Sequence, residues 1–359
     1  MSLLNEGEII GVTYEVERLL GEGEFAEVYR VKHRFLGRQA MKVFKLVGMT
    51  IAEVERALAE ACLLSRIGHP NIIRVFDANV SDSSAGQIGY FTMEYVAGGT
   101  LNAFRRTYGN SFIPVSLTLQ IIRQVCCGLA VAHSAQPPII HRDVKPQNIL
   151  VGYDDQGPRV RLSDFGLAKH VNPLTLQASA RGTRSFKPPE SFEDVQSDSP
   201  AGDVWAVGLC FYLLLTDTLP YLGENDPDEA VPAIPTRAWR PPSDFNVQVD
   251  RETDEVVHRA LALRSSERYR DAVEFLTDLD RIVFRRCPST TTGEVPNSMA
   301  EVPALEMARK MAEHATALAR EATRLGEAAS LLERALEICP MLRRDYGYRL
   351  ELWRKGVAQ

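Results

Sequence analysis

The chain has 359 residues, of which 45% are hydrophobic and 25% are charged, as is usual for a globular protein with more than one domain. A formal net charge of -6 argues against a nucleic-acid binder, because no basic excess is present to neutralise phosphates. Six cysteines without a C-x-x-C pair favour reduced, mostly buried thiols and a cytoplasmic location. No signal peptide is visible, and the longest apolar run, 204–215, is too short to span a bilayer, so we expect no membrane segment.

The N-terminal residues 1–13 carry no periodic pattern, and we expect a loose lead-in. A strand is predicted over 14–20, where polar and apolar side chains alternate. The sequence then reads GEGEFAEV over 21–28, and such glycines let the backbone come close to a ligand. A G-x-G turn alone is equally typical of a plain β-hairpin. Its position favours a ligand, because a β-branched strand and then Lys42, in the segment AMKV, follow it.

A helix, two strands and a second helix come next. Apolar residues recur at helical spacing over 51–67. Strands are predicted over 72–79 and 88–94, joined by the polar turn SDSSAGQ. Gly98-Gly99 then lets the chain turn, and an apolar helix over 117–133 ends before a Pro-Pro pair.

Three short motifs stand close together in the next stretch. The chain reads HRDVKPQN over 141–148, DFG over 164–166 and PPE over 188–190. The five fixed residues of the pattern H-R-D-x-K-x-x-N recur by chance in about one chain in ten thousand of this length. The motif is therefore specific.

Together these motifs resemble the catalytic and activation segments of the eukaryotic-type, or Hanks-type, serine/threonine protein kinase family. The resemblance covers roughly residues 14–285. It implies an α+β, two-lobed kinase fold, with a β-rich N-lobe over 14–93, a hinge over 94–99 and a helical C-lobe over 100–285.

The resemblance implies a role for each polar residue of the motifs. Asp143 accepts the proton of the attacking hydroxyl, and Lys145 contacts the transferring phosphate. Lys42 anchors ATP. Its partner is Glu60, selected among the glutamates of the preceding helix by register against the turn at 69–71.

ATP and Mg²⁺ are the implied cofactors, with Mn²⁺ as an alternative metal. Asn148 and Asp164 offer hard oxygen ligands, which suit Mg²⁺. Met93 takes the gatekeeper place at the back of the adenine pocket, and it serves equally as core. The residues implied to surround the nucleotide are Gly21, Glu22, Gly23, Ala26, Val28, Ala40, Lys42, Met93, Glu94, Val96 and Leu150.

Glutamates are frequent in the glycine-rich segment. Glu22, Glu24 and Glu27 would repel a triphosphate if they pointed inward, so we expect all three to face solvent. Ala26 stands where the family usually has its third glycine, and it adds only a methyl group.

The resemblance also implies how the C-lobe is held and which hydroxyl is used. Glu190 is expected to pair with Arg268. Asp203 is expected to brace the catalytic-loop backbone, since a buried carboxylate needs such donors. Lys145 together with Thr183 favours serine or threonine over tyrosine as the acceptor.

Residues 167–187 lack apolar periodicity and form the candidate activation loop. We expect Ser179, with Thr175 as second choice, to be phosphorylated in trans by another copy of the chain and to switch the enzyme on. The cations implied to hold the phosphate are Arg56, Arg142 and Lys169. The alternative is that these cations are merely solvated and that the loop is ordered without phosphate.

Substrate preference is inferred from acidic residues that this chain lacks at two positions. Basophilic relatives place acids where this chain has Thr100 and Gln147, so we expect no strong preference for arginine before the acceptor. Leu167, directly after the DFG motif, resembles the serine-favouring members.

The C-terminal part falls outside the resemblance. Residues 219–242 are proline-rich, and we expect a short or irregular helix there. A polar linker spans 286–302, and an α-helical region spans 303–359. Its expected helices are 303–325, 327–338 and 344–355. The run AASLLERALEICP weakly resembles the second helix of a tetratricopeptide repeat; the alternative is an extension packed on the C-lobe.

The expected activity is ATP- and Mg²⁺-dependent phosphorylation of serine or threonine in proteins. The alternative is a pseudokinase or scaffold that uses the helical tail to bind a protein partner. The presence of Lys42, Glu60, Asp143, Asn148 and Asp164 favours the enzyme.

Overall fold

The computed structural model describes residues 2–23, 26–45, 68–84, 86–109, 111–154, 157–165, 184–193, 197–220, 239–286, 302–319, 324–338 and 343–354. The chain forms two compact units. The first comprises Met1–Val96, Thr100–Leu150 and Val160–Arg286, and the second comprises Ala97–Gly99, Val151–Arg159 and Cys287–Gln359.

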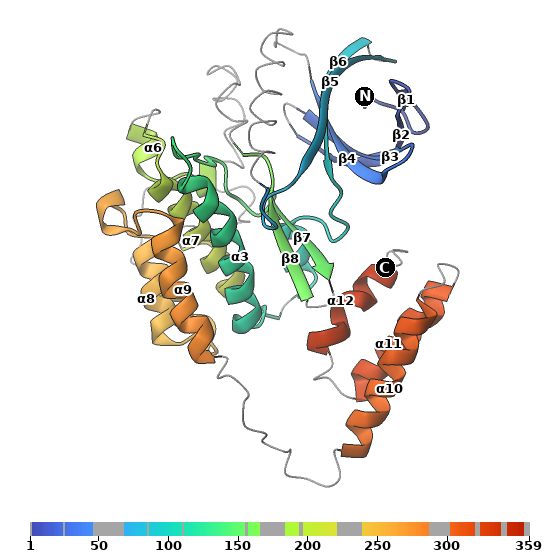
Figure 1. Cartoon of the computed structure of the whole chain (residues 1–359). Helices are drawn as coiled ribbons and strands as arrows, with labels where there is room; N and C mark the ends of the chain where they lie inside the picture. Colours follow the sequence, from blue (N-terminus) through green and yellow to red (C-terminus); the bar gives the residue numbers. More distant parts are fainter. Residues whose placement is uncertain are drawn as a thin grey trace. The chain divides into compact units, whose positions relative to one another are not determined.

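A six-stranded antiparallel sheet forms the strand-rich lobe of the first unit (Figure 1). Its spatial order is β1-β2-β3-β4-β6-β5. The strands are β1 (Ile9–Ile10), β2 (Tyr14–Glu22), β3 (Ala26–His33), β4 (Gly37–Phe44), β5 (Val75–Ser83) and β6 (Gly86–Glu94). Both faces of β4 are buried, because Met41 and Val43 enter one apolar cluster while Ala40 enters another.

One strand begins later than the sequence predicts. The strand expected over 72–79 starts at Val75. Ile73 instead donates its N–H to the carbonyl of Leu162 at 2.9 Å, outside the large sheet. This hydrogen bond satisfies the Ile73 amide without strand pairing in the large sheet.

The N-terminal segment packs onto the sheet and does not form the loose lead-in that the sequence predicts. Leu4 and Ile10 are buried in one of the two sheet clusters. The Leu3 N–H donates to Glu27 Oε2 at 2.8 Å, and the Leu4 N–H donates to the Tyr29 hydroxyl at 3.0 Å. The segment is therefore part of the lobe.

Glu27 is 1% exposed, so the expectation that it faces solvent is wrong. Its carboxylate accepts hydrogen bonds from the Leu3 N–H and the Tyr29 hydroxyl. Lys45 Nζ lies 3.9 Å from the other carboxylate oxygen. These donors and the nearby positive charge make a buried carboxylate tolerable.

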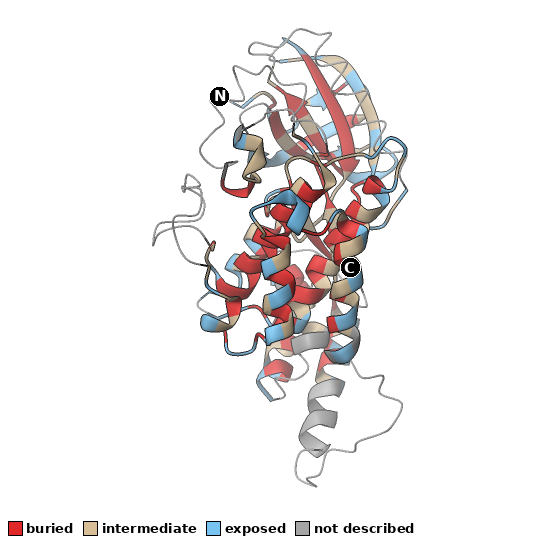
Figure 2. Cartoon of the chain, turned by 90° about the vertical axis from the view of Figure 1, so that its left-hand side faces the viewer, coloured by how far each residue is buried: buried red, intermediate tan, exposed pale blue. Residues whose placement is uncertain are grey.

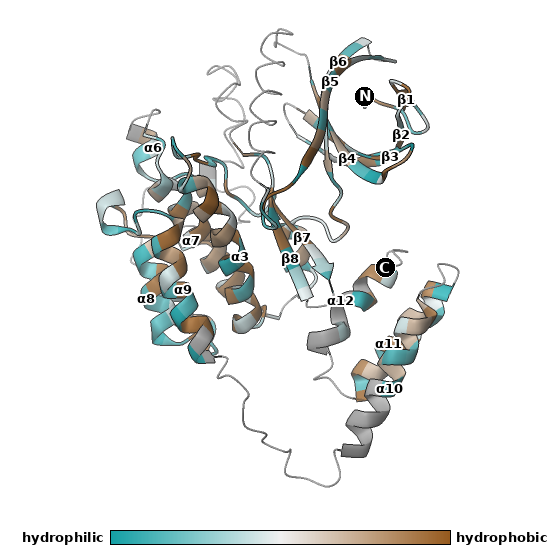
Figure 3. Ribbon diagram, in the orientation of Figure 1, coloured by the Kyte–Doolittle hydropathy of each residue, from teal (hydrophilic) through white to brown (hydrophobic). Residues whose placement is uncertain are grey.

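Helices dominate the rest of the first unit. They are α2 (Leu101–Arg106), α3 (Val115–His133), α6 (Glu190–Glu193), α7 (Pro200–Thr216), α8 (Arg251–Ala260) and α9 (Ala272–Arg286), with 3₁₀ turns η2 (Arg184–Phe186), η3 (Pro242–Asp244) and η4 (Ser265–Glu267). α7 is hydrophobic along nearly its whole length, whereas α8 and α9 also carry hydrophilic residues (Figure 3). α3 packs against α7 and α9. Much of the helical part of this unit is buried, as the red residues in Figure 2 show. The proline-rich stretch lies mostly outside the described residues.

Among the described helices, α3 alone is long and apolar enough to cross a membrane. More than half of it is buried inside the protein. Its buried side chains include Leu119, Ile122 and Val125. Burial of this kind is typical of a core helix.

The start of α7 is fixed by local sequence. Ser199 has extended backbone angles, and its hydroxyl accepts the Gly202 N–H at 3.2 Å. Pro200 then occupies the first turn, where its missing N–H costs nothing. The cap thereby places Asp203 in the first turn of a buried helix.

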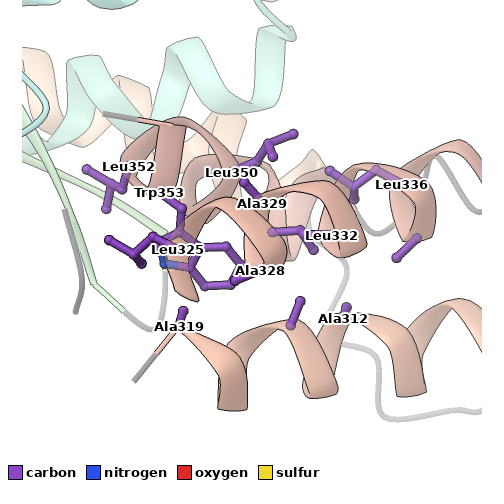
Figure 4. Packing of buried hydrophobic residues seen from close by; sticks show 12 residues of the cluster. Ala312, Ala319, Leu325, Ala328, Ala329, Leu332, Leu336, Leu350, Leu352 and Trp353 are labelled. Atoms are coloured by element: carbon purple, nitrogen blue, oxygen red, sulfur yellow. The ribbon is translucent and has the colours of Figure 1, made fainter. Parts of the chain in front are cut away.

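Three helices, α10 (Val302–Leu318), α11 (Leu325–Ile338) and α12 (Arg343–Arg354), make up most of the described second unit. Their small and apolar side chains, among them Ala312, Leu332 and Trp353, form one cluster (Figure 4). Gly326 lies in the first turn of α11 and does not separate two helices as expected. The resemblance to a tetratricopeptide repeat stays a prediction. Of the expected linker, residue 286 ends α9 and residue 302 begins α10, and the residues between them lie outside the described part of the chain.

Two short chain segments complete the second unit, one of them in the hairpin of β7 (Ile149–Asp154) and β8 (Gly157–Leu162). The Val151 N–H donates to the Gly99 carbonyl at 2.8 Å. A Cβ on Gly98 would lie 2.0 Å from the Val151 carbonyl oxygen, so only glycine fits there.

Candidate active site

The predicted catalytic residues of the loop before β7 lie together. Asp143 Oδ2 is 2.9 Å from both Lys145 Nζ and Asn148 Nδ2, which donate to it. Asn148 Nδ2 also donates to the Asp143 carbonyl at 2.8 Å. The Asp143 carboxylate is therefore held in one orientation, beside a lysine that can contact an anion.

The backbone of this loop is held by the first turn of α7. Asp203 is 2% exposed, and its carboxylate accepts the N–H groups of His141 at 2.7 Å and Arg142 at 2.8 Å. His133 Nε2 lies 3.0 Å from the same carboxylate. The predicted brace is confirmed.

Two non-glycine residues of the site have left-handed backbone. Arg142 has φ 68° and Asp164 has φ 62°. Such conformations cost free energy and persist only where surrounding contacts impose them. For Arg142, the hydrogen bond from its N–H to Asp203 is one such contact.

Lys42 in β4 meets Asp164 directly. Lys42 Nζ donates to Asp164 Oδ1 at 2.6 Å, and the two side chains are 15% and 24% exposed. Burial raises the pKa of the Asp164 carboxyl, but the charge and hydrogen bond of Lys42, together with the nearby Lys145 and His141, bring that pKa below its usual value. Asp164 is therefore ionised at neutral pH. The expected partner Glu60 lies outside the described residues.

The donor set fits a hard divalent cation. Asn148 uses its amide nitrogen on Asp143, so its amide oxygen is the atom that can face a metal. Asp164 supplies an ionised carboxylate. An amide oxygen and a carboxylate are ligands that Mg²⁺ accepts, with water and phosphate oxygens completing its shell.

Six of the residues implied to surround the nucleotide share one apolar cluster. Ala26, Ala40 and Met93 are buried in it, and Val28, Val96 and Leu150 pack against it. They come from β3, β4, the end of β6 and β7, so residues far apart in sequence meet there. An apolar surface of this kind suits a flat base.

Glu94, the first residue of the expected hinge, is engaged within the protein. Its carboxylate pairs with Arg161 at 2.8 Å, and its N–H donates to the Arg74 carbonyl at 2.9 Å. Its assignment to the nucleotide site stays a prediction.

The glycine-rich turn joins β2 and β3. Gly21 pairs with Val28 across the two strands, and the Gly23 N–H donates to the Ala26 carbonyl at 2.8 Å. Ala26 is buried in the same apolar cluster as Ala40 and Met93. Its methyl group therefore adds apolar contact that a glycine at this position would lack. Glu22 is exposed, as expected, and Glu24 lies outside the described residues.

Two further contacts concern packing around the site. Arg268 donates to Glu190 through both terminal nitrogens, at 2.7 and 2.8 Å, so that predicted pair is confirmed. The rings of His141 and Phe165 lie 4.3 Å apart between centroids and are tilted by 40° to each other. Burial lowers the pKa of His141, so this ring is neutral at neutral pH.

Of the residues proposed to carry or hold the activation-loop phosphate, the structure describes only Arg142. The Arg142 guanidinium donates through Nε to Asp198 Oδ2 at 2.7 Å. Lys187 Nζ donates to the Arg142 carbonyl at 2.9 Å. Neither Asp198 nor Lys187 belongs to a motif, so no signal in the sequence points to them. The other proposed members, Arg56, Lys169, Thr175 and Ser179, lie outside the described residues, as does Thr183.

Residues 14–278 match the model of the protein kinase domain family. The chain belongs to the protein kinase family. It is 31% identical to a probable serine/threonine-protein kinase of Clostridium perfringens over 289 residues, and 31% identical to the serine/threonine-protein kinase PknB of Mycobacterium leprae over 274 residues. These alignments cover 79% and 75% of this chain.

Solved structures show the same fold. The crystal structure of the PknI kinase domain from Mycobacterium tuberculosis superposes with a TM-score of 0.57 at 27% identity. The match covers 77% of this chain and 99% of that one. The two-lobed kinase fold expected from the sequence is thus confirmed. The chain aligns with only 40% and 43% of the length of the two curated relatives named above.

Proposed function

We propose that this protein transfers the γ-phosphate of ATP to serine or threonine hydroxyls of proteins. The observation that carries the proposal is the cluster of Asp143, Lys145 and Asn148, held beside the ion pair of Lys42 and Asp164 in one kinase unit. The names of the two relatives, both serine/threonine kinases, support the choice of acceptor.

Each residue has a task in this reaction. Asp143 accepts the proton of the acceptor hydroxyl and orients it, while Lys145 contacts the moving phosphoryl oxygens. Asn148 and Asp164 would hold Mg²⁺, which supplies neutralising charge to the ATP phosphates. Lys42 anchors the nucleotide phosphates from β4.

A pseudokinase would bind nucleotide or partners without turnover. Such proteins lack one or more of the residues that perform the chemistry, and here Lys42, Asp143, Asn148 and Asp164 are all present. We therefore propose the enzyme over the scaffold.

Finer properties belong to the same proposal. We propose Mg²⁺ as the physiological metal, no strong need for arginine before the acceptor, and serine over threonine. Trans-phosphorylation of Ser179 or Thr175 between two copies, a protein partner for α10 to α12 and a cytoplasmic location are further proposals. Arrays of acceptor peptides test the substrate preference, and a dominant arginine requirement would refute it.

Asp143→Asn tests the proposed reaction. The variant should lose phosphotransfer from radiolabelled ATP by about a thousandfold or more, because the proton acceptor is gone. ATP binding, followed by the thermal shift of the same sample, should stay near that of the wild type. Wild-type rates in this variant would overturn the proposal.

A further inference from the structure

Arg142 is held at each of its polar groups. Its N–H donates to Asp203, its carbonyl accepts from Lys187, and its guanidinium donates to Asp198. The residue has φ 68°, a conformation that needs such support. Because Asp143 follows directly in the chain, the backbone that carries the proton acceptor is set by these contacts.

Asp198 makes the contact that the family resemblance does not explain. The Arg142 and Asp198 side chains are 17% and 34% exposed, so their ion pair is partly shielded from water. Lys187 brings a second positive charge next to the Arg142 carbonyl. The Asp198 carboxylate therefore offsets a local excess of positive charge.

Asp198 also lies beside the N-terminus of a long helix. It directly precedes Ser199, the residue that caps α7, and Asp203 lies in the first turn of the same helix. One buried helix end thus holds both the backbone and the guanidinium of Arg142. Neither of these two contacts requires a residue of the activation loop.

We propose that Asp198 is a positioning residue, which holds Arg142 and with it the catalytic loop when the activation loop carries no phosphate. The inference rests on the proposed kinase activity. The pairing gives the phosphate-free enzyme a basal activity, so phosphorylation of the loop would raise an existing activity and not start it from zero. A loop phosphate, with close to two negative charges, would have to share or take over the guanidinium that Asp198 already binds.

The test uses the full chain treated with phosphatase, its phosphate-free state checked by mass spectrometry. Asp198→Asn keeps the side-chain shape and removes the charge. It should lower kcat by about tenfold while KM for ATP changes less than about twofold, because orientation near the chemistry is lost and nucleotide contacts are not. Asp198→Ser should give the same loss in kcat. It replaces the asparagine variant in the test if that variant does not fold.

The matched control is Glu255→Gln, which removes the charge of a carboxylate paired with Arg251 on the exposed side of α8, where the two side chains are 66% and 92% exposed. It should leave kcat unchanged. A double-mutant cycle with Arg142→Ala separates positioning from folding: Asp198→Asn should cost less than about twofold in that background, since its target is absent.

The outcomes separate the two hypotheses. An untreated wild type that transfers no phosphate would contradict the proposed function. A wild type that is active before phosphatase treatment and inactive after it would overturn the role of Asp198, because the loop phosphate would then be required. An active wild type with an equally active Asp198→Asn variant would overturn the role of Asp198. A loss that is the same with and without Arg142 would overturn it as well, because Asp198 would then act elsewhere.

Discussion

At the scale of single residues, the ion pair of Lys42 and Asp164 connects the strand-rich lobe to the DFG segment. Lys42→Met removes the positive charge and keeps the apolar stem. Phosphotransfer should fall by at least about a hundredfold, because the ATP phosphates lose a preorganised cation. Steady-state kinetics with a protein or peptide acceptor measures the loss, and unchanged activity would mean that another lysine anchors the phosphates.

Residue-level prediction from the sequence worked where a motif fixes both identity and spacing. Asp143, Lys145 and Asn148 were expected together because the motif places them within six residues, and they are together. Glu27 could not be placed in this way. Its burial depends on hydrogen bonds from Leu3 and Tyr29. The local sequence around Glu27 does not predict which donors the tertiary structure brings to it.

At the scale of elements, Arg268, which follows η4, forms an ion pair with Glu190, the first residue of α6. The Arg268 side chain is 0% exposed, pairs with Glu190 and also donates to the carbonyls of Ala262 and Leu263. Arg268→Lys cannot reproduce these bonds, so we expect a loss of about 2–4 kcal/mol in the free energy of unfolding.

Urea unfolding measures the effect of Arg268→Lys. Arg264→Lys is the control, since Arg264 pairs with Glu267 in solvent and its side chain is 81% exposed. Surface pairs contribute little, so the control should change stability by less than about 0.5 kcal/mol. Equal effects in the two variants would contradict the structural role of Arg268.

The N-terminal segment gives a second test at this scale. Leu4 is 2% exposed and packs in the cluster that contains Val16 and Met41. Leu4→Ala should destabilise the protein by about 2–5 kcal/mol, because a buried cavity is left. Val12→Ala, at a side chain that is 85% exposed, should be nearly neutral. A neutral Leu4→Ala would support the loose lead-in that the sequence predicts.

The periodicity of the sequence predicted most elements, and the differences have local causes. The helix expected over 117–133 runs from Val115 to His133, because an apolar stripe and a Pro-Pro pair define it. The strand at β5 starts late because Ile73 bonds to Leu162. β1 has only two residues, too few for any alternation to show.

At the scale of the whole molecule, the second unit has a core of its own. Trp353 is 4% exposed within the cluster of α10, α11 and α12. Trp353→Ala should destabilise these helices by about 3–5 kcal/mol, since a large buried ring is removed. Hydrogen exchange should show faster exchange in α10 and α11, and unchanged protection there would contradict the packing in Figure 4.

The central claim is that this chain is an active serine/threonine kinase. The most direct measurement is incubation of the wild-type protein with γ-labelled ATP, Mg²⁺ and a protein acceptor, followed by analysis of the phosphorylated amino acids. We predict label on serine and threonine, and none with Asp143→Asn. ATP binding without any transfer of label, in wild type as in the variant, would contradict the account.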